Sequence, residues 1–277
     1  PITISSEVDL EDDHVYFDLG SSSTINYNGT VAQIIPASIS NSRSGGDTDS
    51  RVPVNYGNLT INNNTGTTTT DATGRTINVA GNWTNNGVFT ATGSTVNFTG
   101  NGAQAITGTN TTTFNDVTIA KKGGTLTVNT DATVADDLTF TASSGTLSVS
   151  NSKTLNIADN LILNNNANNS VTASITGSGT LLANTVIVGP ALNPNNNSTR
   201  TTTLNSSVST FTVSNDLEIN SYYNGGNRRN NGVFNLQSGV LTINGEINTT
   251  NENSGNTSTF SMASGAQSGL LKLTAAS

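Results

Sequence analysis

Several residue types are scarce in this chain of 277 residues, and each scarcity excludes a class of protein. Cysteine is absent, so neither disulfide bonds nor thiolate chemistry can contribute. The single histidine, His14, excludes a multi-histidine metal site. Only 10% of the residues are charged, and the sequence pI is near 4.4. Because nucleic-acid binding needs a basic surface, we expect none here.

Long apolar runs are missing as well. No run reaches the length that a membrane-spanning helix needs, so no membrane span is expected in this piece. The opening segment, PITISSEVDL, lacks the basic and apolar regions of a signal peptide. If the protein is exported, its targeting signal is therefore expected to have been removed or to lie outside this sequence.

Small polar residues dominate what is present. The chain holds 43 Asn, 47 Thr, 32 Ser and 27 Gly. Threonine favours a pleated, half-buried backbone, whereas asparagine and glycine favour turns. The net charge of −8 is low for a disordered chain of this composition. The composition therefore predicts an ordered, all-β protein made of strands and turns.

A long internal repeat is visible. STINYNGTVAQII (Ser23–Ile35) returns later in the chain as STVNFTGNGAQAI (Ser94–Ile106). Each copy is followed by a loop and a similar strand, YGNLTIN (Tyr56–Asn62) or FNDVTIA (Phe114–Ala120). The repeat predicts that a unit of several strands recurs along the chain.

A shorter repeat joins two brief strands through a tight polar corner. Its apolar residues alternate with polar ones, which gives each strand one apolar face. Val117, Leu138 and Leu161 follow one another at near-regular spacings, each close to the length expected for one turn of a coil. Five segments share the design: INVAGNWTNN (Ile77–Asn86), ATVADDLTFT (Ala132–Thr141), LNIADNLILN (Leu155–Asn164), FTVSNDLEIN (Phe211–Asn220) and LTINGEINTT (Leu241–Thr250).

These repeats predict a parallel β-helix, or β-solenoid, with rungs of roughly 21–25 residues and about 12 rungs. One continuous solenoid is expected over residues 1–277. This solenoid is expected to be a fragment of a longer chain. A β-sandwich is the rival fold. It would use two-residue hairpin turns at Asn-Gly pairs, such as Asn28-Gly29, Asn86-Gly87, Asn101-Gly102 and Asn231-Gly232.

The stretch NIADNLILNNNANNS (Asn156–Ser170) shows how such a rung would be built. Leu161 and Leu163 are predicted to point into the core, and Asn164–Asn169 to form a corner. Asparagines stacked in successive rungs can bond amide to amide along the axis. Trp83 is predicted to fill the core or to cap a rung.

The repeat STxN-aromatic-xGxxAQ with its following strand, and the segment GNWTNNGVFTA (Gly81–Ala91), resemble the β-solenoid repeats of large exported surface proteins of Bacteroidetes-type bacteria. In physical design they are similar to filamentous-haemagglutinin and autotransporter passengers. The resemblance implies an extracellular stalk or adhesin segment at the bacterial cell surface, exported by the type IX route. The C-terminal sorting domain of such proteins is not evident in a chain that ends LLKLTAAS.

Binding residues are expected on long loops, since a rigid scaffold can carry them there. Three long loops are predicted, near residues 40–53, 189–203 and 220–232. The last holds Tyr222, Tyr223, Arg228 and Arg229. Aromatic rings stack on sugars and arginine binds carboxylates, so these four residues are candidates for glycan binding.

Two acidic groups are candidates for a metal site. Asp9, Glu11, Asp12 and Asp13 precede His14, and their carboxylates could hold Ca²⁺, although the cluster lacks the glycine-bearing loop of an EF-hand and is read first as a solvated acidic edge. Asp47 and Asp49 are read in the same way. Asp136–Asp137 is read as a turn pair at a strand corner. No cofactor other than this calcium is expected.

The sequence therefore predicts a non-catalytic structural or adhesive module, because no set of catalytic residues is apparent. Its expected partners are neighbouring domains or copies of itself in a fibre, and surface glycans. A carbohydrate-active β-helix, which binds or degrades glycans, is one alternative. An ice-binding solenoid is another, with outward Thr60, Thr118, Thr139 and Thr242 as its threonine ladder.

Overall fold

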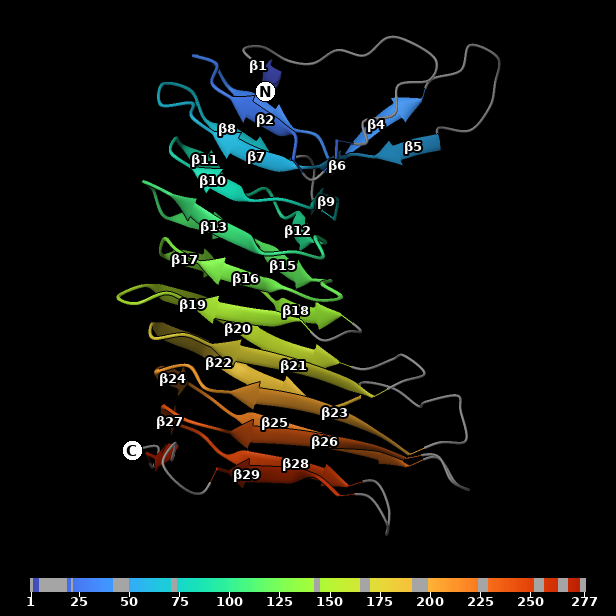
Figure 1. Cartoon of the computed structure of the whole chain (residues 1–277), viewed down its shortest axis with the longest axis vertical. Helices are drawn as coiled ribbons and strands as arrows, with labels where there is room; N and C mark the ends of the chain where they lie inside the picture. Colours follow the sequence, from blue (N-terminus) through green and yellow to red (C-terminus); the bar gives the residue numbers. More distant parts are fainter. Residues whose placement is uncertain are drawn as a thin grey trace.

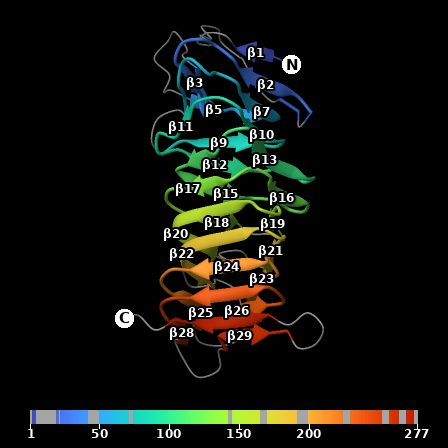
Figure 2. The same ribbon diagram turned by 90° about the vertical axis from the view of Figure 1, so that its left-hand side faces the viewer.

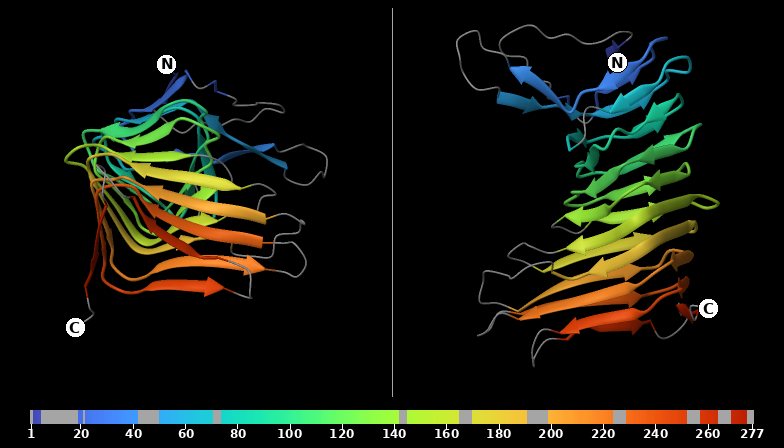
Figure 3. Two further views of the ribbon diagram at one scale, coloured as in Figure 1. Left: turned by 60° about the horizontal axis from the view of Figure 1, so that its bottom comes forward. Right: turned by 180° about the vertical axis from the view of Figure 1, so that it is seen from behind.

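The computed structural model describes residues 2–4, 19–20, 22–41, 50–70, 74–141, 145–164, 170–190, 199–223, 229–251, 257–263 and 269–274. In this part of the chain there are 30 strands and no helix. The strands wind as one coil from β1 near the N-terminus to β30 near the C-terminus (Figure 1). Seen obliquely from its C-terminal end, the coil has strands on several sides of its interior (Figure 3, left). Buried apolar side chains fill this interior. The predicted all-β parallel β-helix is thus confirmed.

Each rung contributes one strand to each of three faces, which we call face 1, face 2 and face 3. Face 1 consists of β1 (Ile2–Ile4), β2 (Thr24–Tyr27), β7 (Asn58–Ile61), β10 (Trp83–Asn85), β13 (Gln104–Gly108), β16 (Thr125–Val128), β19 (Thr146–Val149), β21 (Val171–Thr176), β23 (Thr199–Ser206), β26 (Arg229–Leu236) and β29 (Thr259–Met262).

Face 2 consists of β3 (Gln33–Ile35), β8 (Thr68–Thr70), β11 (Phe89–Thr90), β14 (Thr112–Phe114), β17 (Ala132–Val134), the first halves of β20 (Thr154–Asn164) and β22 (Thr180–Val188), β24 (Thr210–Val213), β27 (Val240–Ile243) and β30 (Leu270–Leu273). Face 3 consists of β6 (Asn55–Tyr56), β9 (Thr76–Val79), β12 (Thr95–Phe98), β15 (Asp116–Ile119), β18 (Leu138–Thr141), the second halves of β20 and β22, β25 (Leu217–Tyr223) and β28 (Ile247–Asn251).

The strands of a face run parallel and in register, one rung above the next (Figure 2). Val117 lies over Leu138, which lies over Leu161, as their spacing predicts. Only two of the described strand pairs are antiparallel, and both are local hairpins. One is formed by β4 (Ser38–Asn41) and β5 (Ser50–Pro53), which project from the coil near its N-terminal end (Figure 1). The β-sandwich alternative is therefore wrong.

Rung length varies along the coil. On face 1, Leu59 pairs with Trp83 and Leu126 with Leu147, and both steps fall within the predicted range of rung lengths. Toward the C-terminus the rungs lengthen beyond that range, as the step from Ser206 to Leu236 shows. Part of the extra length lies in the strands themselves, since β23 and β26 are longer than the other strands of face 1.

Parts of the three predicted long loops belong to strands. Residues 50–53 belong to β5, residues 199–203 to β23, and residues 220–223 and 229–232 to β25 and β26. These segments are mainly polar, so they lack the apolar alternation that marked the other strands. In β23 and β26, backbone pairing with the adjacent rung forms strands of face 1 instead.

The interior is a continuous column of aliphatic and aromatic side chains. Leu161 and Leu163 are fully buried, as predicted, whereas Ile162 between them points outward and is half-buried. Trp83 is fully buried and packs edge-on against Phe89 and Phe114, with ring centroids 5.0 Å from each. The prediction that Trp83 fills the core is confirmed.

Outward asparagines form ladders along the axis, as predicted. At the end of face 1, Asn62 Nδ2 donates to Asn26 Oδ1 at 2.8 Å, and Asn86 Nδ2 donates to Asn62 Oδ1 at 3.0 Å; Asn62 and Asn86 directly follow β7 and β10. On face 3, Asn97 Nδ2 donates to Asn78 Oδ1 at 2.9 Å. These bonds join successive rungs on the outside of the coil. Of the predicted asparagine corner, residues 165–169 lie outside the described part of the chain.

The alternation within one strand gives a test of this packing. Leu161→Ala removes a fully buried side chain and leaves a cavity, so we expect it to lower the free energy of unfolding by about 2–5 kcal/mol. Ile162→Ala, one position away on the outer surface, is expected to cost about 1 kcal/mol or less. Urea unfolding followed by circular dichroism measures both. Equal losses would contradict the inward and outward assignment.

Candidate functional site

The predicted binding residues of the third loop lie on a hairpin. β25 and β26 pair in antiparallel fashion at their outer ends, with Tyr222 opposite Asn230 and Tyr223 opposite Arg229. The side chain of Tyr222 is half-buried. Arg228 lies outside the described residues, as do the side chains of Tyr223 and Arg229. The backbone thus brings two of the four candidates, Tyr223 and Arg229, into one cross-strand pair.

The predicted calcium ligands Asp9, Glu11, Asp12 and Asp13 all lie outside the described residues, as do Asp47 and Asp49. The described part of the chain has a different acidic cluster, at the corner between face 2 and face 3. There, one carboxylate oxygen each of Asp136, Asp137 and Asp159 lies within 4.8 Å of the others. Asp136 is exposed, and the other two are half-buried.

The stacking of rungs in register brings this second acidic cluster, which we call the acidic edge, together. Asp136–Asp137 and Asp159–Asn160 are corners of successive rungs, and Asp116 begins β15 one rung earlier. The negative charge of Asp116, followed by partial desolvation and the charges of Asp137 and Asp159, raises the pKa of Asp136. Sequence reasoning found the pair but missed Asp159. The recurrence of the core residues Leu138 and Leu161, which follow these corners directly, was the signal that could have found it.

Two of these carboxylates also bond the next rung. The Asp137 amide donates to Asp116 Oδ1 at 3.3 Å, and the Asn160 amide and Nδ2 donate to Asp137 Oδ1 at 3.1 and 2.9 Å. The interpretation of Asp136–Asp137 as a turn pair fits this corner position. The edge offers oxygen ligands of the kind that calcium prefers, and its oxygens also hold the corners together.

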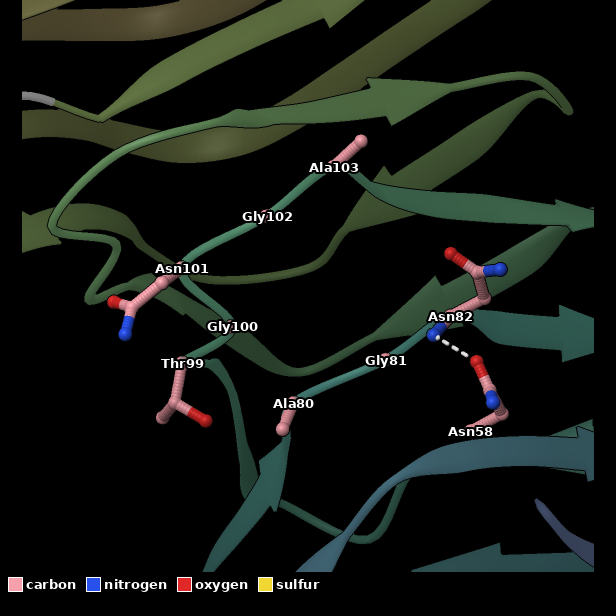
Figure 4. Close-up of a pocket in the computed structure, with 9 residues that line it drawn as sticks. All are labelled: Asn58, Ala80, Gly81, Asn82, Thr99, Gly100, Asn101, Gly102 and Ala103. Atoms are coloured by element: carbon pink, nitrogen blue, oxygen red, sulfur yellow. Dashed lines mark hydrogen bonds between the residues drawn. The ribbon is translucent and has the colours of Figure 1, made fainter. Parts of the chain in front are cut away.

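A polar cavity of about 430 Å³ lies at the corner between face 3 and face 1 (Figure 4). Two successive corners, Ala80–Asn82 and Thr99–Ala103, form it together with Asn58 below. Asn58 Oδ1 accepts the Asn82 amide at 2.8 Å, and Asn82 Oδ1 accepts the Ala105 amide at 2.8 Å. The lining includes backbone groups and three asparagine side chains, which can hydrogen-bond a polar molecule, together with Thr99 and two alanines.

Behind this cavity, Gln104 joins two corners. It is buried, its Nε2 donates to Val79 O at 2.9 Å and Gly81 O at 2.6 Å, and its Oε1 accepts the Gly100 amide at 3.0 Å. Gly100 must be a glycine, because a Cβ there would lie 2.2 Å from Ala80 O. The glutamine of the repeat motif thus satisfies the backbone groups of the turn.

Lys121, from the next rung, completes this network. Its side chain is fully buried, and its ammonium donates to Gly100 O at 2.6 Å, Gly102 O at 2.8 Å and Gln104 Oε1 at 2.8 Å. Burial lowers the pKa of Lys121 to about 8, while the three oxygens favour its charged form. An ammonium has three protons to donate, so these acceptors satisfy it. Sequence reasoning gave no role to this lysine.

The first copy of the repeat has the same network with an asparagine in place of the lysine. Gln33 Oε1 accepts the Gly29 amide at 2.8 Å, and Asn63 Nδ2 donates to Val31 O at 2.7 Å and Gln33 Oε1 at 3.3 Å. Asn63 follows β7 just as Lys121 follows β15, so the two residues occupy equivalent positions.

The two copies nevertheless lie at different corners. Gln33 lies between face 1 and face 2, and Gln104 lies between face 3 and face 1. The long repeat therefore returns a unit of several strands, as predicted, but at a different corner of the coil. The repeated unit is one corner, its two strands and the strand stacked beneath.

Comparison with protein-family models finds no match for this chain, and neither curated proteins nor solved structures match it. Within the described residues, no helix has the length and apolarity needed to cross a membrane.

Substitution of Lys121 tests the network. Lys121→Leu leaves Gly100 O, Gly102 O and Gln104 Oε1 without the donor that they share, and two of the three lost bonds are buried. We therefore expect it to lower the free energy of unfolding at pH 7 by about 2–4 kcal/mol. Lys121→Asn introduces the residue found at the equivalent position of the first repeat. We expect it to lower the free energy of unfolding by at most about half as much as Lys121→Leu does. Chemical unfolding of the three proteins measures the difference. Equal losses in both variants would contradict the proposed equivalence of Asn63 and Lys121.

The same variants give a pH dependence. Because the pKa of Lys121 falls from 10.5 to about 8 on folding, the unfolded chain binds more protons between these values. Stability from this group therefore rises with pH across that window, by about 1–3 kcal/mol. Burial also raises the pKa of Tyr27 to about 12, so the contribution of Tyr27 to stability falls as the pH rises above 10. This contribution is the same in wild type and in Lys121→Asn, so it cancels from the difference between the two proteins. A stability difference between these two proteins that stays constant from pH 7 to 10 would contradict the prediction.

Proposed function

We propose that this chain is a non-catalytic structural and adhesive module, a stalk or fibre segment of a protein at the bacterial cell surface. The observation that carries the proposal is the use of the outward polar side chains. They bond one rung to the next along the axis, as in the series Asn26, Asn62 and Asn86 at the end of face 1. On face 1 near the C-terminus, Asn235 Nδ2 donates to Asn205 Oδ1 at 2.9 Å.

Such ladders suit a mechanical role. Each rung is joined to its neighbours by backbone hydrogen bonds on three faces and, in addition, by side-chain amides on the outside. A force on one rung is thus shared by many bonds, each worth about 0.5–1.5 kcal/mol net.

Two features support the proposed partners. The last strands expose Met262, Leu270 and Leu273, an apolar surface that a neighbouring domain or a second copy would cover in a fibre. The hairpin with the Tyr223–Arg229 pair projects beyond the compact rung and is the favoured place for surface glycans. Glycan binding at this hairpin would also fit the first alternative function, a carbohydrate-active β-helix.

Ice binding is a second candidate, and one observation favours it. Small polar residues stack in adjacent outward rows on face 1, with Thr125 and Thr127 over Thr146 and Ser148, followed by Ser174 and Thr176. The ladder expected from sequence is wrong, however. Thr118 and Thr139 are neighbours on face 3, but Thr60 lies on face 1 and Thr242 on face 2. Thermal hysteresis of the folded protein distinguishes this candidate from a stalk.

Antibodies against the folded chain should label intact cells of the organism that makes it. Deleting its coding segment should reduce adhesion of those cells and leave their breakdown of polysaccharides unchanged, because the rungs carry load and bind but do not cleave. The purified chain, incubated with a panel of polysaccharides, should release neither reducing ends nor unsaturated products. Release of a specific product would overturn the proposal in favour of the carbohydrate-active alternative.

A further inference from the structure

The Asn-Gly pairs of this chain differ in whether the glycine N–H donates a hydrogen bond. Asparagine followed by glycine is the sequence most prone to lose its side-chain amide, because no Cβ shields the next backbone nitrogen. The reaction requires that nitrogen to attack the asparagine Cγ. A glycine N–H that is held by a structural acceptor is therefore protected.

Five Asn-Gly pairs lie in the described part of the chain, and Asn224-Gly225 lies outside it. In four of the five, the glycine N–H donates a hydrogen bond. The acceptors are Gln33 Oε1 for Gly29 (2.8 Å), Asn85 Oδ1 for Gly87 (3.2 Å), Ser221 Oγ for Gly232 (3.0 Å) and Asn215 O for Gly245 (3.0 Å).

Asn101-Gly102 is the exception among the described pairs. Within the part of the chain that the structure describes, no hydrogen bond engages the Gly102 N–H, and both residues are exposed. A Cβ built on Gly102 would meet nothing within 4 Å, so the surroundings leave room for the ring that the reaction forms. Figure 4 shows the Asn101 side chain at the outer end of the corner, directed away from Asn82.

We infer that Asn101 is a site of spontaneous covalent modification, converted to an aspartyl or isoaspartyl residue. The Gly102 nitrogen gives up its proton to solvent base and forms a bond to Asn101 Cγ. The Cγ–Nδ2 bond breaks, and the amide group leaves as ammonia, so a succinimide ring remains. Water then opens the ring at either carbonyl. The net change consumes one water and releases one ammonia, with no oxidation or reduction.

The position of this site gives the reaction a structural consequence. Lys121 holds Gly100 O and Gly102 O, the carbonyls on either side of Asn101. The isoaspartyl product adds a methylene to the main chain between these two anchors. Both products place a carboxylate beside the polar cavity that Asn101 and Gly102 line. Conversion therefore changes the charge of this corner and the geometry around Lys121 together.

The test is peptide mapping by mass spectrometry of the full chain, incubated at mildly alkaline pH either folded or unfolded in urea. In the unfolded chain all six Asn-Gly pairs should react at similar rates. In the folded chain Asn101 should keep a rate within several-fold of its unfolded rate, whereas Asn28, Asn86, Asn231 and Asn244 should be slowed at least about tenfold. Protection of Asn101 equal to that of the other four would overturn the inference.

Gly102→Ala is the matched variant. Its Cβ would enter open space, and Gly102 lacks the left-handed φ of Gly108 or Gly124, so the fold should be kept. The added methyl shields the attacking nitrogen, and the folded variant should convert Asn101 several-fold more slowly than wild type. Circular dichroism and the urea midpoint confirm that the variant is folded. An unchanged rate in the folded variant would show that attack by the Gly102 nitrogen is not the route.

Discussion

Parallel, in-register stacking of successive rungs is the constraint on which the rest of this structure depends. Residues that share a register position lie one above another at the strand spacing of about 4.8 Å. Inside the coil this places Leu126 on Leu147 and makes a continuous apolar column. Outside it places Asn78 on Asn55 and Asn97 on Asn78, so that each amide bonds the next. One geometric rule thus explains why so few residue types suffice.

The corner, rather than the rung, is the unit that the sequence repeats. Gln33 and Gln104 satisfy the backbone of equivalent turns at two different corners of the coil. The residue that completes each network comes from the next rung, Asn63 in one case and Lys121 in the other. The same corner can occupy two different edges of the coil because it depends only on its own strands and the strand stacked beneath. This independence allows rungs to differ in length while the faces stay aligned.

Sequence patterns predicted what local chemistry decides. The alternation in LNIADNLILN identified Leu161 and Leu163 as core residues, and the repeat spacing indicated the parallel coil. What depends on register across rungs was not predictable. Asp159 joins the acidic edge, and Lys121 reaches a turn of the preceding rung, only because of how the rungs stack. Residues 199–203 form a strand because the neighbouring rung pairs with them. Their own polar sequence does not indicate a strand.

The most direct test of in-register parallel stacking uses engineered disulfides, since the chain has no cysteine of its own to compete. Thr95 lies opposite Asp116 and Asn97 opposite Thr118 on neighbouring strands of face 3. Cysteines at either pair should form a disulfide in the folded protein, because register partners lie within disulfide reach. Strands running in opposite directions could bring at most one of these pairs together. Cross-linking of both pairs is the result that the parallel coil predicts, and cross-linking of one alone would contradict it.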